Sequence, residues 1–302
     1  MMFVGIDGGG TTTRLFIQHC DEDAQYFEFP ISLKVRNGDF STSAEKLRKI
    51  VAQTFTDRSH YHASIKLVLG LSGMSQDEDQ EQFRSALLAL PEFQDASVQI
   101  ETDATLTLRS VLAEGEEGIL MIAGTGSVVF YQPEGHPARR IGGWGPLLSD
   151  EGSGYRIGLR ALRHYLNVMD NVFPRDALSQ AIAMRIADSD ATPRTVTARA
   201  ETDPSFVASF AQDVFEKSAT DHHIREIAIN EIVDLVTLLF PIMAPGVLSG
   251  TKPYNLYLSG GIARQPIVTH VIEEAFQEGN LQVHIVNERA PAYKALELAH
   301  AL

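Results

Sequence analysis

Short apolar stretches alternate with glycine- and threonine-rich turns through the first 115 residues, and this pattern predicts an α/β unit. The first three stretches follow one another closely and predict a β-meander. Helices are predicted to begin at two pairs with capping-box spacing, Thr42/Glu45 and Ser75/Glu78, and again after Thr102. The predicted strands cover residues 3–6, 15–19, 24–29, 67–69 and 98–101.

Near residue 115 the pattern restarts, again as apolar strand, glycine-threonine turn and apolar strand. A mostly helical stretch follows, and its long amphipathic helix is expected to stop at Pro241. The predicted elements here are strands at 119–122, 128–131, 256–258 and 283–286 and a final helix at 291–301. We therefore expect two lobes joined by a hinge. They cover residues 1–115, onto which the final helix (about 291–302) packs back, and residues 116–290, with a helical insertion at about 155–250.

The charge balance narrows the choice of partners. The chain has 302 residues, with 39 acidic and 25 basic side chains and a net charge of −14 at pH 7. So acidic a protein repels nucleic acid and anionic membranes, and neither is expected as a partner. The absence of a signal peptide and of a membrane-length apolar stretch, together with a single cysteine, Cys20, leads us to expect a cytoplasmic protein.

Two glycine-rich turns between strands are candidate phosphate-binding sites. Glycines let backbone N–H groups approach a phosphate closely, although such a turn can also need glycine only for a positive φ. A P-loop is excluded because its lysine is missing, and a dinucleotide-binding motif because a strand follows the glycines of the first turn and the second lacks the third glycine. The occurrence of one turn in each lobe favours two phosphate clamps. The turns consist of Asp7, Gly8, Gly9, Gly10, Thr11, Thr12 and Thr13, and of Gly124, Thr125, Gly126 and Ser127.

Asp103 lies between a predicted strand and a predicted helix. A carboxylate there is placed to accept a proton from a substrate hydroxyl. It can equally be an ordinary helix N-cap, and the two roles are compatible.

The chain's only tryptophan, Trp144, stands between glycines, which is a poor setting for a core residue. The glycines on either side of Trp144 leave the backbone accessible, which suits a polyhydroxylated ligand that binds main-chain donors. Asp150 follows a few residues later, either as part of the same substrate wall or as a partner of the helix dipole in the first turn of the next helix.

Five motifs in order give the chain a resemblance to a known family. They are Asp7-Gly-Gly-Gly-Thr11, Thr102-Asp103-Ala104, Gly124-Thr-Gly-Ser127, Gly142-Gly-Trp-Gly145 with Asp150-Glu-Gly-Ser153, and Ser259-Gly-Gly-Ile262. In these, and over nearly its whole length, the chain resembles the N-acetylglucosamine kinase and bacterial glucosamine kinase group. That group belongs to the BadF/BadG-type ATPases of the actin–hexokinase–Hsp70 superfamily.

The resemblance implies an α/β protein with a two-lobed RNase H-like (actin/hexokinase-type) fold and ATP in a central cleft. It implies that Asp103 is the general base and that Asp7 holds Mg²⁺ through water. The implied ATP-binding residues are the two glycine-rich turns together with Gly260 and Gly261. The implied substrate-binding residues are Asn37, Ser72, Gly73, Asp103, Gly143, Trp144 and Asp150. The family has a sugar-contacting asparagine after its third strand, and Asn37 is the nearest candidate for it in this sequence. The surrounding residues, Lys34 to Gly38, depart from the small residues usual there in the family.

The expected function is ATP-dependent phosphorylation of the 6-hydroxyl of N-acetylglucosamine or glucosamine, with a homodimer as the expected assembly. A sugar- or nucleotide-sensing module without turnover and an ATPase or polyphosphate hydrolase of the same fold remain as alternatives. The iron–sulfur activator branch of the family needs cysteines that one Cys20 cannot supply. Four histidines (His60, His62, His222 and His223) are expected to be solvent-exposed residues without a role. Arg139 and Arg140 are expected to be an exposed pair in a hairpin, with contact to a phosphate as the alternative.

Overall fold

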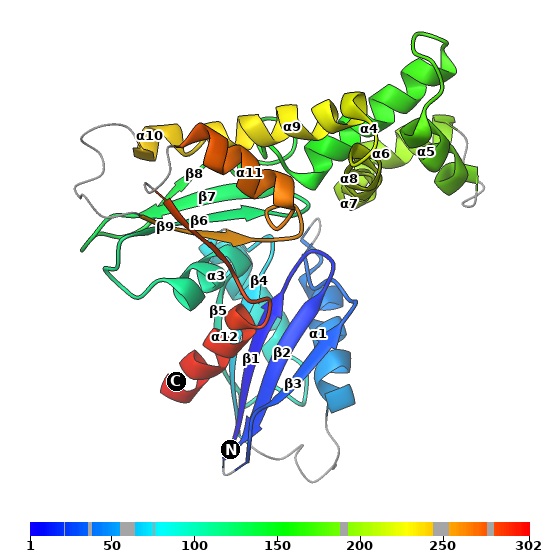
Figure 1. The fold of residues 1–302 in the computed structure, drawn as a ribbon. Helices are drawn as coiled ribbons and strands as arrows, with labels where there is room; N and C mark the ends of the chain where they lie inside the picture. The colour runs from blue at the N-terminus through cyan, green and yellow to red at the C-terminus, as the bar shows by residue number, and fades with distance from the viewer. Residues whose placement is uncertain are drawn as a thin grey trace. The chain divides into compact units, whose positions relative to one another are not determined.

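The structure is a computed structural model that describes residues 1–20, 22–35, 38–54, 64–74, 76–187, 193–243, 254–276 and 281–302. These residues form two compact units (Figure 1). The first unit consists of Met1–Glu114 and Asn287–Leu302, and the second of Gly115–Val286. Each unit is built around its own five-stranded sheet.

The sheet of the first unit has the strand order β3-β2-β1-β4-β5. Its first three strands form an antiparallel meander, as their pattern predicted, and β4 and β5 continue the sheet parallel to β1. Because β1, β4 and β5 run the same way, their carboxyl ends lie at one edge. The strands are β1 (Met2–Gly8), β2 (Thr13–His19), β3 (Gln25–Phe29), β4 (Ile65–Leu71) and β5 (Ser97–Thr102).

Helices cover both faces of this sheet. The buried side chains of α1 (Phe40–Thr54) and α2 (Asp77–Leu88) join one core with one face of the strands. Those of α3 (Asp103–Val111) and α12 (Ala290–Ala301) pack with Phe3 and Val68 on the other face. The last helix of the chain thus belongs to the first unit and packs on its central strand.

Of the two capping boxes expected in this unit, the first does not form as predicted and the second includes a residue outside the described ones. Helix α1 begins at Phe40, and Asp39 accepts the hydrogen bond from the backbone N–H of Thr42, at 3.0 Å. Thr42 therefore lies inside the first turn, and the assignment of Thr42 as the cap is wrong. Helix α2 begins after Gln76, which makes no side-chain cap, while Ser75 lies outside the described residues.

The sheet of the second unit repeats the arrangement of the first. Its order is β10-β9-β6-β7-β8, with an antiparallel meander of β6, β7 and β8 and with β9 and β10 parallel to β6. The sequence pattern did not predict the short strand β8, which contains the two arginines Arg139 and Arg140. The strands are β6 (Gly118–Ala123), β7 (Ser127–Gln132), β8 (Arg139–Ile141), β9 (Tyr254–Ser259) and β10 (Leu281–Ile285).

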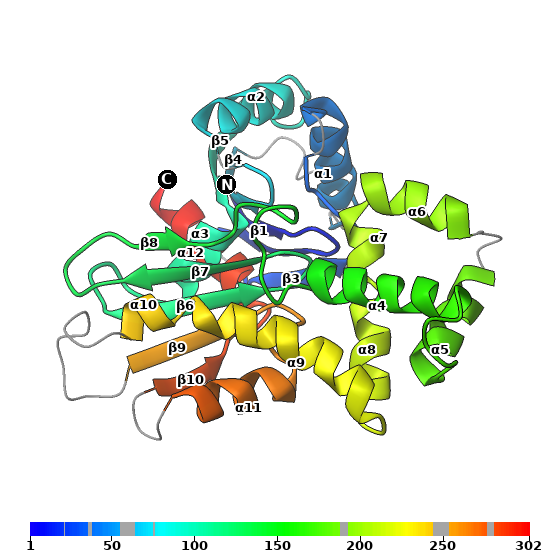
Figure 2. The same ribbon diagram turned by 90° about the horizontal axis from the view of Figure 1, so that it is seen from above.

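Between β8 and β9 the second unit is helical, and the end of the predicted insertion, 244–250, lies outside the described residues. Figure 2 shows α9 and α11 side by side over the sheet, and α4 packs against α5, α7, α8 and α9. Helix α9 ends at Thr237, so Pro241 does not stop it; this proline lies within α10. The helices are α4 (Gly154–Met169), α5 (Ala177–Ala187), α6 (Pro193–Thr202), α7 (Pro204–Ala208), α8 (Ala211–Ser218), α9 (His222–Thr237), α10 (Phe240–Met243) and α11 (Pro266–Ala275).

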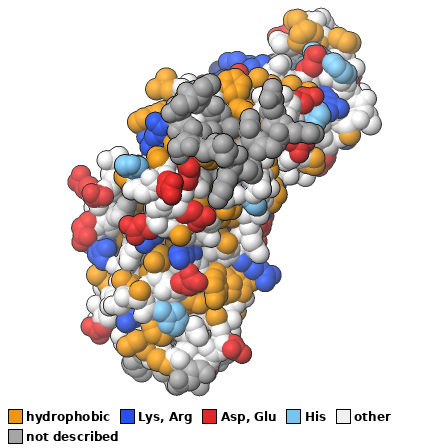
Figure 3. Space-filling view, turned by 60° about the vertical axis from the view of Figure 1, so that its left-hand side comes forward, with side chains coloured by type: hydrophobic (Ala, Val, Ile, Leu, Met, Phe, Trp, Pro, Cys, Tyr) orange, Lys and Arg blue, Asp and Glu red, His pale blue; other side chains and the backbone are white. Residues whose placement is uncertain are grey.

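On the face drawn in Figure 3, acidic, basic and apolar side chains are interspersed and the acidic ones do not gather in one block. Within the described ranges, no helix is long and apolar enough to cross a bilayer.

Candidate active site

Several candidate residues of the first unit meet where its parallel strands end. Asp7 is paired with Gly70 of β4, and Leu71 is paired with Thr102 of β5, so Asp7, Ser72 and Asp103 all follow or end strands at the same edge. The backbone N–H of Ser72 donates to the Gly8 carbonyl, at 3.1 Å. The carboxyl edge of parallel strands is where α/β proteins commonly bind ligands.

The first glycine-rich turn does not use glycine for a left-handed backbone. None of Gly8, Gly9 and Gly10 has a positive φ, so the alternative explanation of this turn is wrong. A Cβ on Gly8 would lie 2.6 Å from the Leu71 side chain, which is a packing reason for that glycine. For Gly10 no described atom lies within 4 Å of an added Cβ, and its backbone is therefore open on that side.

The threonines of this turn differ in what their hydroxyls can do. Thr13 is buried and its hydroxyl donates to the Ile31 carbonyl at 2.6 Å, so this hydroxyl stabilises the fold. Thr11 is exposed and Thr12 is partly buried. The Thr12 carbonyl accepts from the Gly9 N–H at 3.1 Å and closes the turn.

Asp103 is free of the capping role, because Thr102 is the N-cap of α3. The Thr102 hydroxyl accepts from the Thr105 N–H at 2.9 Å. The Asp103 carboxylate accepts from the Ala104 N–H at 2.9 Å and from the Ser72 hydroxyl. Burial raises the pKa of Asp103, while these two hydrogen bonds and the positive charge of Lys34 oppose the increase.

Asp7 is the second carboxylate at this edge. Burial, followed by repulsion from Asp103, raises the pKa of Asp7 to about 7, against an opposing attraction from Arg14. A cation beside Asp7 would offset both unfavourable effects, so the carboxylate fits the role of a metal-holding group. Among the described residues, no three His, Cys, Asp or Glu side chains cluster so as to hold a metal ion by themselves.

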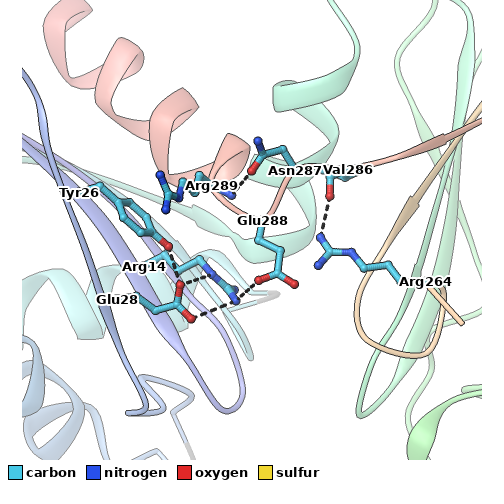
Figure 4. A network of polar contacts seen from close by, with 8 residues as sticks. All are labelled: Arg14, Tyr26, Glu28, Arg264, Val286, Asn287, Glu288 and Arg289. Atoms are coloured by element: carbon cyan, nitrogen blue, oxygen red, sulfur yellow. Dashed lines mark hydrogen bonds and ion pairs between the residues drawn. The ribbon is translucent and has the colours of Figure 1, made fainter. Parts of the chain in front are cut away.

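Arg14 is paired with Asp7 across β1 and β2 and attracts its carboxylate. It also belongs to an ion-pair network that the sequence did not reveal (Figure 4). Its guanidinium pairs with Glu28 at 3.3 Å and with Glu288 at 2.6 Å, and the Tyr26 hydroxyl also donates to Glu28. Glu288 precedes α12 and is 274 positions from Arg14. No local pattern can reveal a pair so distant in sequence.

In the second unit the other glycine-rich turn is held by the start of α4. The Gly124 and Thr125 carbonyls accept from the N–H groups of Gly154 and Tyr155, at 2.7 and 3.1 Å. The Ser127 hydroxyl is buried and donates to the Glu151 carbonyl at 2.7 Å, so it too serves the fold. Gly124 has no positive φ, and an added Cβ would meet no described atom within 4 Å.

Gly260 and Gly261, the predicted adenosine motif, follow β9 beside that turn. The N–H groups of Ile262 and Ala263 both donate to the Ala123 carbonyl, at 2.9 and 3.0 Å. Gly260 has a φ of 96°, and a Cβ there would lie 2.7 Å from the Ala123 carbonyl carbon and closer still to its oxygen. At Gly261, by contrast, no atom of the described residues lies within 4 Å of an added Cβ.

The predicted sugar-binding residues of the second unit lie in the loop between β8 and α4. Trp144 is 70% exposed and lies under the Arg140 guanidinium, 4.0 Å from the ring centroid. Asp150 is buried, accepts from the Gly145 N–H at 3.1 Å, and lies 2.7 Å from the position that a Cβ on Gly126 would occupy. Helix α4 begins only at Gly154 with Ser153 as its cap, so Asp150 is not in a first helical turn and that alternative is wrong.

The remaining expected residues are placed as follows. Gly73 turns the chain after Ser72 with a φ of 88°. Gly143 has a φ of 70° and packs against the Val128 side chain. His222 and His223 are exposed beside Glu226 on α9. Asn37, His60 and His62 lie outside the described residues.

A sequence profile of the BadF/BadG/BcrA/BcrD ATPase family matches residues 4–299, and the chain belongs to this family. It is 27% identical to an N-acetyl-D-glucosamine kinase of Dictyostelium discoideum over 95% of this chain and 93% of that protein. It is 29% identical to a glucosamine kinase of Vibrio cholerae over 60% of each.

Solved structures of similar fold include a candidate N-acetylglucosamine kinase from Chromobacterium violaceum. It has a TM-score of 0.78 and 21% identity, over 99% of this chain and 98% of that one. A ROK-family glucokinase from Streptomyces griseus, in complex with glucose and AMPPNP, has a TM-score of 0.55 and 12% identity over the whole of both chains. The predicted fold class, a two-lobed α/β protein of the actin–hexokinase type, is confirmed.

Proposed function

We propose that the chain is an ATP-dependent amino-sugar kinase that phosphorylates the 6-hydroxyl of N-acetylglucosamine or glucosamine. One observation carries the proposal: each predicted nucleotide motif contains a glycine without a structural reason. Gly10, Gly124 and Gly261 have neither a positive φ nor a described atom within 4 Å of an added Cβ. Glycine is favoured where a ligand approaches the backbone closely, and the three backbones are open in that way.

The amino-sugar substrate is carried over from the relatives. Their names state activity on N-acetylglucosamine or glucosamine, and membership of an ATPase family favours ATP as the phosphoryl donor. Trp144 and Asp150 would contact the sugar: the tryptophan offers an exposed ring, and Asp150 is hydrogen-bonded to Gly145 beside it. Assembly as a homodimer stays a prediction.

In the proposed reaction Asp103 accepts the proton of the sugar 6-hydroxyl. The oxygen of that hydroxyl forms a bond to the γ-phosphorus of ATP, and the bond to the β–γ bridging oxygen breaks to release ADP. Because such transition states are loose, the carboxylate serves chiefly to orient the hydroxyl and to take its proton late. Ser72 and the Ala104 N–H hold the carboxylate in place for this task.

Asp7 is the residue that would hold Mg²⁺ through water at the first turn. When bound, the ion would neutralise charge on the phosphates of ATP. The backbone at Gly10, Gly124 and Gly261 leaves room for a phosphate to approach, and the exposed Thr11 would add a hydroxyl donor, which an acidic protein needs in order to hold a phosphate.

Asp103→Asn tests the assignment of the base in a coupled ADP-release assay with N-acetylglucosamine. Asparagine keeps a carbonyl oxygen for the Ala104 N–H but cannot take the proton. We expect kcat to fall by roughly 100-fold or more with a smaller change in the KM for sugar. Asp95→Asn, an exposed aspartate of the same unit, is the matched control. Near-normal sugar-dependent turnover in Asp103→Asn would show that this residue is not the base.

A further inference from the structure

Lys34 brings a positive charge to the predicted base. Its attraction to Asp103 lowers the pKa of that carboxyl. The Lys34 Cε lies 4.0 Å from the position that a Cβ on Gly73 would occupy. Gly73 follows Ser72, whose hydroxyl donates to Asp103. The lysine stem thus runs along the turn that holds the predicted base.

The segment that carries Lys34 is fixed from several directions. Leu33 is fully buried in the core of the first unit. The Ile31 carbonyl accepts from Thr13 at 2.6 Å, and the Ser32 hydroxyl accepts from the Lys34 N–H at 3.2 Å. The same Ser32 hydroxyl donates to a carbonyl of the first glycine-rich turn, at 3.4 Å. The backbone of Lys34 is therefore held between the phosphate turn and the turn before the base.

We propose that Lys34 sets the charge preference of the sugar site, so that neutral and acidic amino sugars are favoured over protonated glucosamine. This inference rests on the proposed kinase function. Two carboxylates, Asp7 and Asp103, lie at this edge and repel each other, and Lys34 offsets the charge of Asp103 as Arg14 offsets that of Asp7. Without the lysine the edge would attract an ammonium group and repel a carboxylate.

The expected size of the effect follows from Coulomb's law. For a substrate charge roughly 8 Å from the ammonium group and an effective dielectric constant of roughly 40, one unit charge changes binding by roughly sixfold. The change has opposite signs for a cationic and an anionic sugar and leaves a neutral sugar unaffected. This dependence on sign separates an electrostatic role from a loss of structure, which would affect all three sugars alike.

The test compares kcat/KM for glucosamine in its ammonium form, neutral N-acetylglucosamine and N-acetylmuramic acid, which carries a carboxylate. For a sugar that binds without being phosphorylated, its competitive inhibition constant replaces kcat/KM. We expect Lys34→Gln to raise kcat/KM for glucosamine and to lower kcat/KM for N-acetylmuramic acid, each roughly sixfold relative to the value for N-acetylglucosamine. Lys34→Arg keeps the charge and should keep the wild-type ratios. Lys49→Gln removes an exposed charge from α1, away from the site, and should also keep the wild-type ratios.

Unchanged ratios in Lys34→Gln, or an equal loss on all three sugars, would overturn the inference. Failure of the proposed function gives a different result, visible before any variant is made. In that case the wild-type protein phosphorylates no sugar of the panel, and the inference falls with the function.

Discussion

Gly260 and Gly261 are neighbours in one motif, yet the structure predicts opposite consequences for their replacement by alanine. At Gly260 the φ of 96° disfavours any side chain, and the new Cβ would overlap the Ala123 carbonyl group. At Gly261 the backbone has no positive φ, and within the described residues the new methyl group would meet nothing. Alanine at Gly260 should therefore destabilise the fold, and alanine at Gly261 should weaken only the binding of a ligand.

The magnitude for Gly260→Ala is the sum of two costs. A left-handed backbone costs a non-glycine residue about 1–2 kcal/mol. Forcing an extra carbon into a packed position costs about 1–3 kcal/mol more. The free energy of unfolding should thus fall by about 2–5 kcal/mol, and the Tm of the second unit by roughly 5–15 °C. For Gly261→Ala we expect a stability change within about 0.5 kcal/mol.

The assay measures the Tm and the KM for ATP of both alanine variants. Gly260→Ala should lower Tm and raise the KM for ATP, because the strand end at Ala123 leads into the second phosphate turn. Gly261→Ala should keep the wild-type Tm and still raise the KM for ATP. A wild-type Tm in Gly260→Ala would refute the packing argument. A wild-type KM in Gly261→Ala would refute the argument that open glycines mark the path of the nucleotide.

Two further predictions concern the carboxylates at the strand ends of the first unit. In Ser72→Ala the Asp103 carboxylate loses a hydrogen bond that lowers its pKa, so the acid limb of the kcat/KM profile should move to higher pH; an unmoved limb would mean that Asp103 does not govern it. The pKa of Asp7 is about 7 in the folded protein against an ordinary 3.8, so the folded state binds this proton more tightly and the contribution of Asp7 to stability falls as the pH rises through that interval. Asp7→Asn should therefore raise Tm more at pH 8 than at pH 4, and an equal change at both would contradict the cause assigned to the shift.

Local pattern predicted most of the strands but not the short edge strand β8, and it did not predict all of the helix ends. The apolar and polar pattern predicted the first meander and the first two strands of the second, because one buried face imposes a two-residue period. The caps were harder, since Asp39 and Thr42 are both suitable N-cap residues and only the backbone conformation decides between them. Strand β8 was missed because Arg139 and Arg140 are exposed on a three-residue edge strand.

The candidate site could be read from the sequence where each motif is continuous. The glycine-rich turns and Asp103 follow strands, and they were recognised from that position. The sequence could not show that Gly10 and Gly261 lack a steric reason while Gly260 has one, because that depends on atoms distant in the chain. Lys34 was missed as a neighbour of Asp103 for the same reason.

The most direct test of the central claim is ADP release from ATP and Mg²⁺ by the wild-type protein, with and without N-acetylglucosamine. The 6-deoxy analogue, which lacks only the hydroxyl that would be phosphorylated, is the matched control. The account predicts ADP release that depends on the sugar, equals the sugar 6-phosphate formed, and is not stimulated by the 6-deoxy analogue. Equal ADP release without sugar would point to a hydrolase, and binding without any ADP would point to a sensing module; either result would contradict the proposed function.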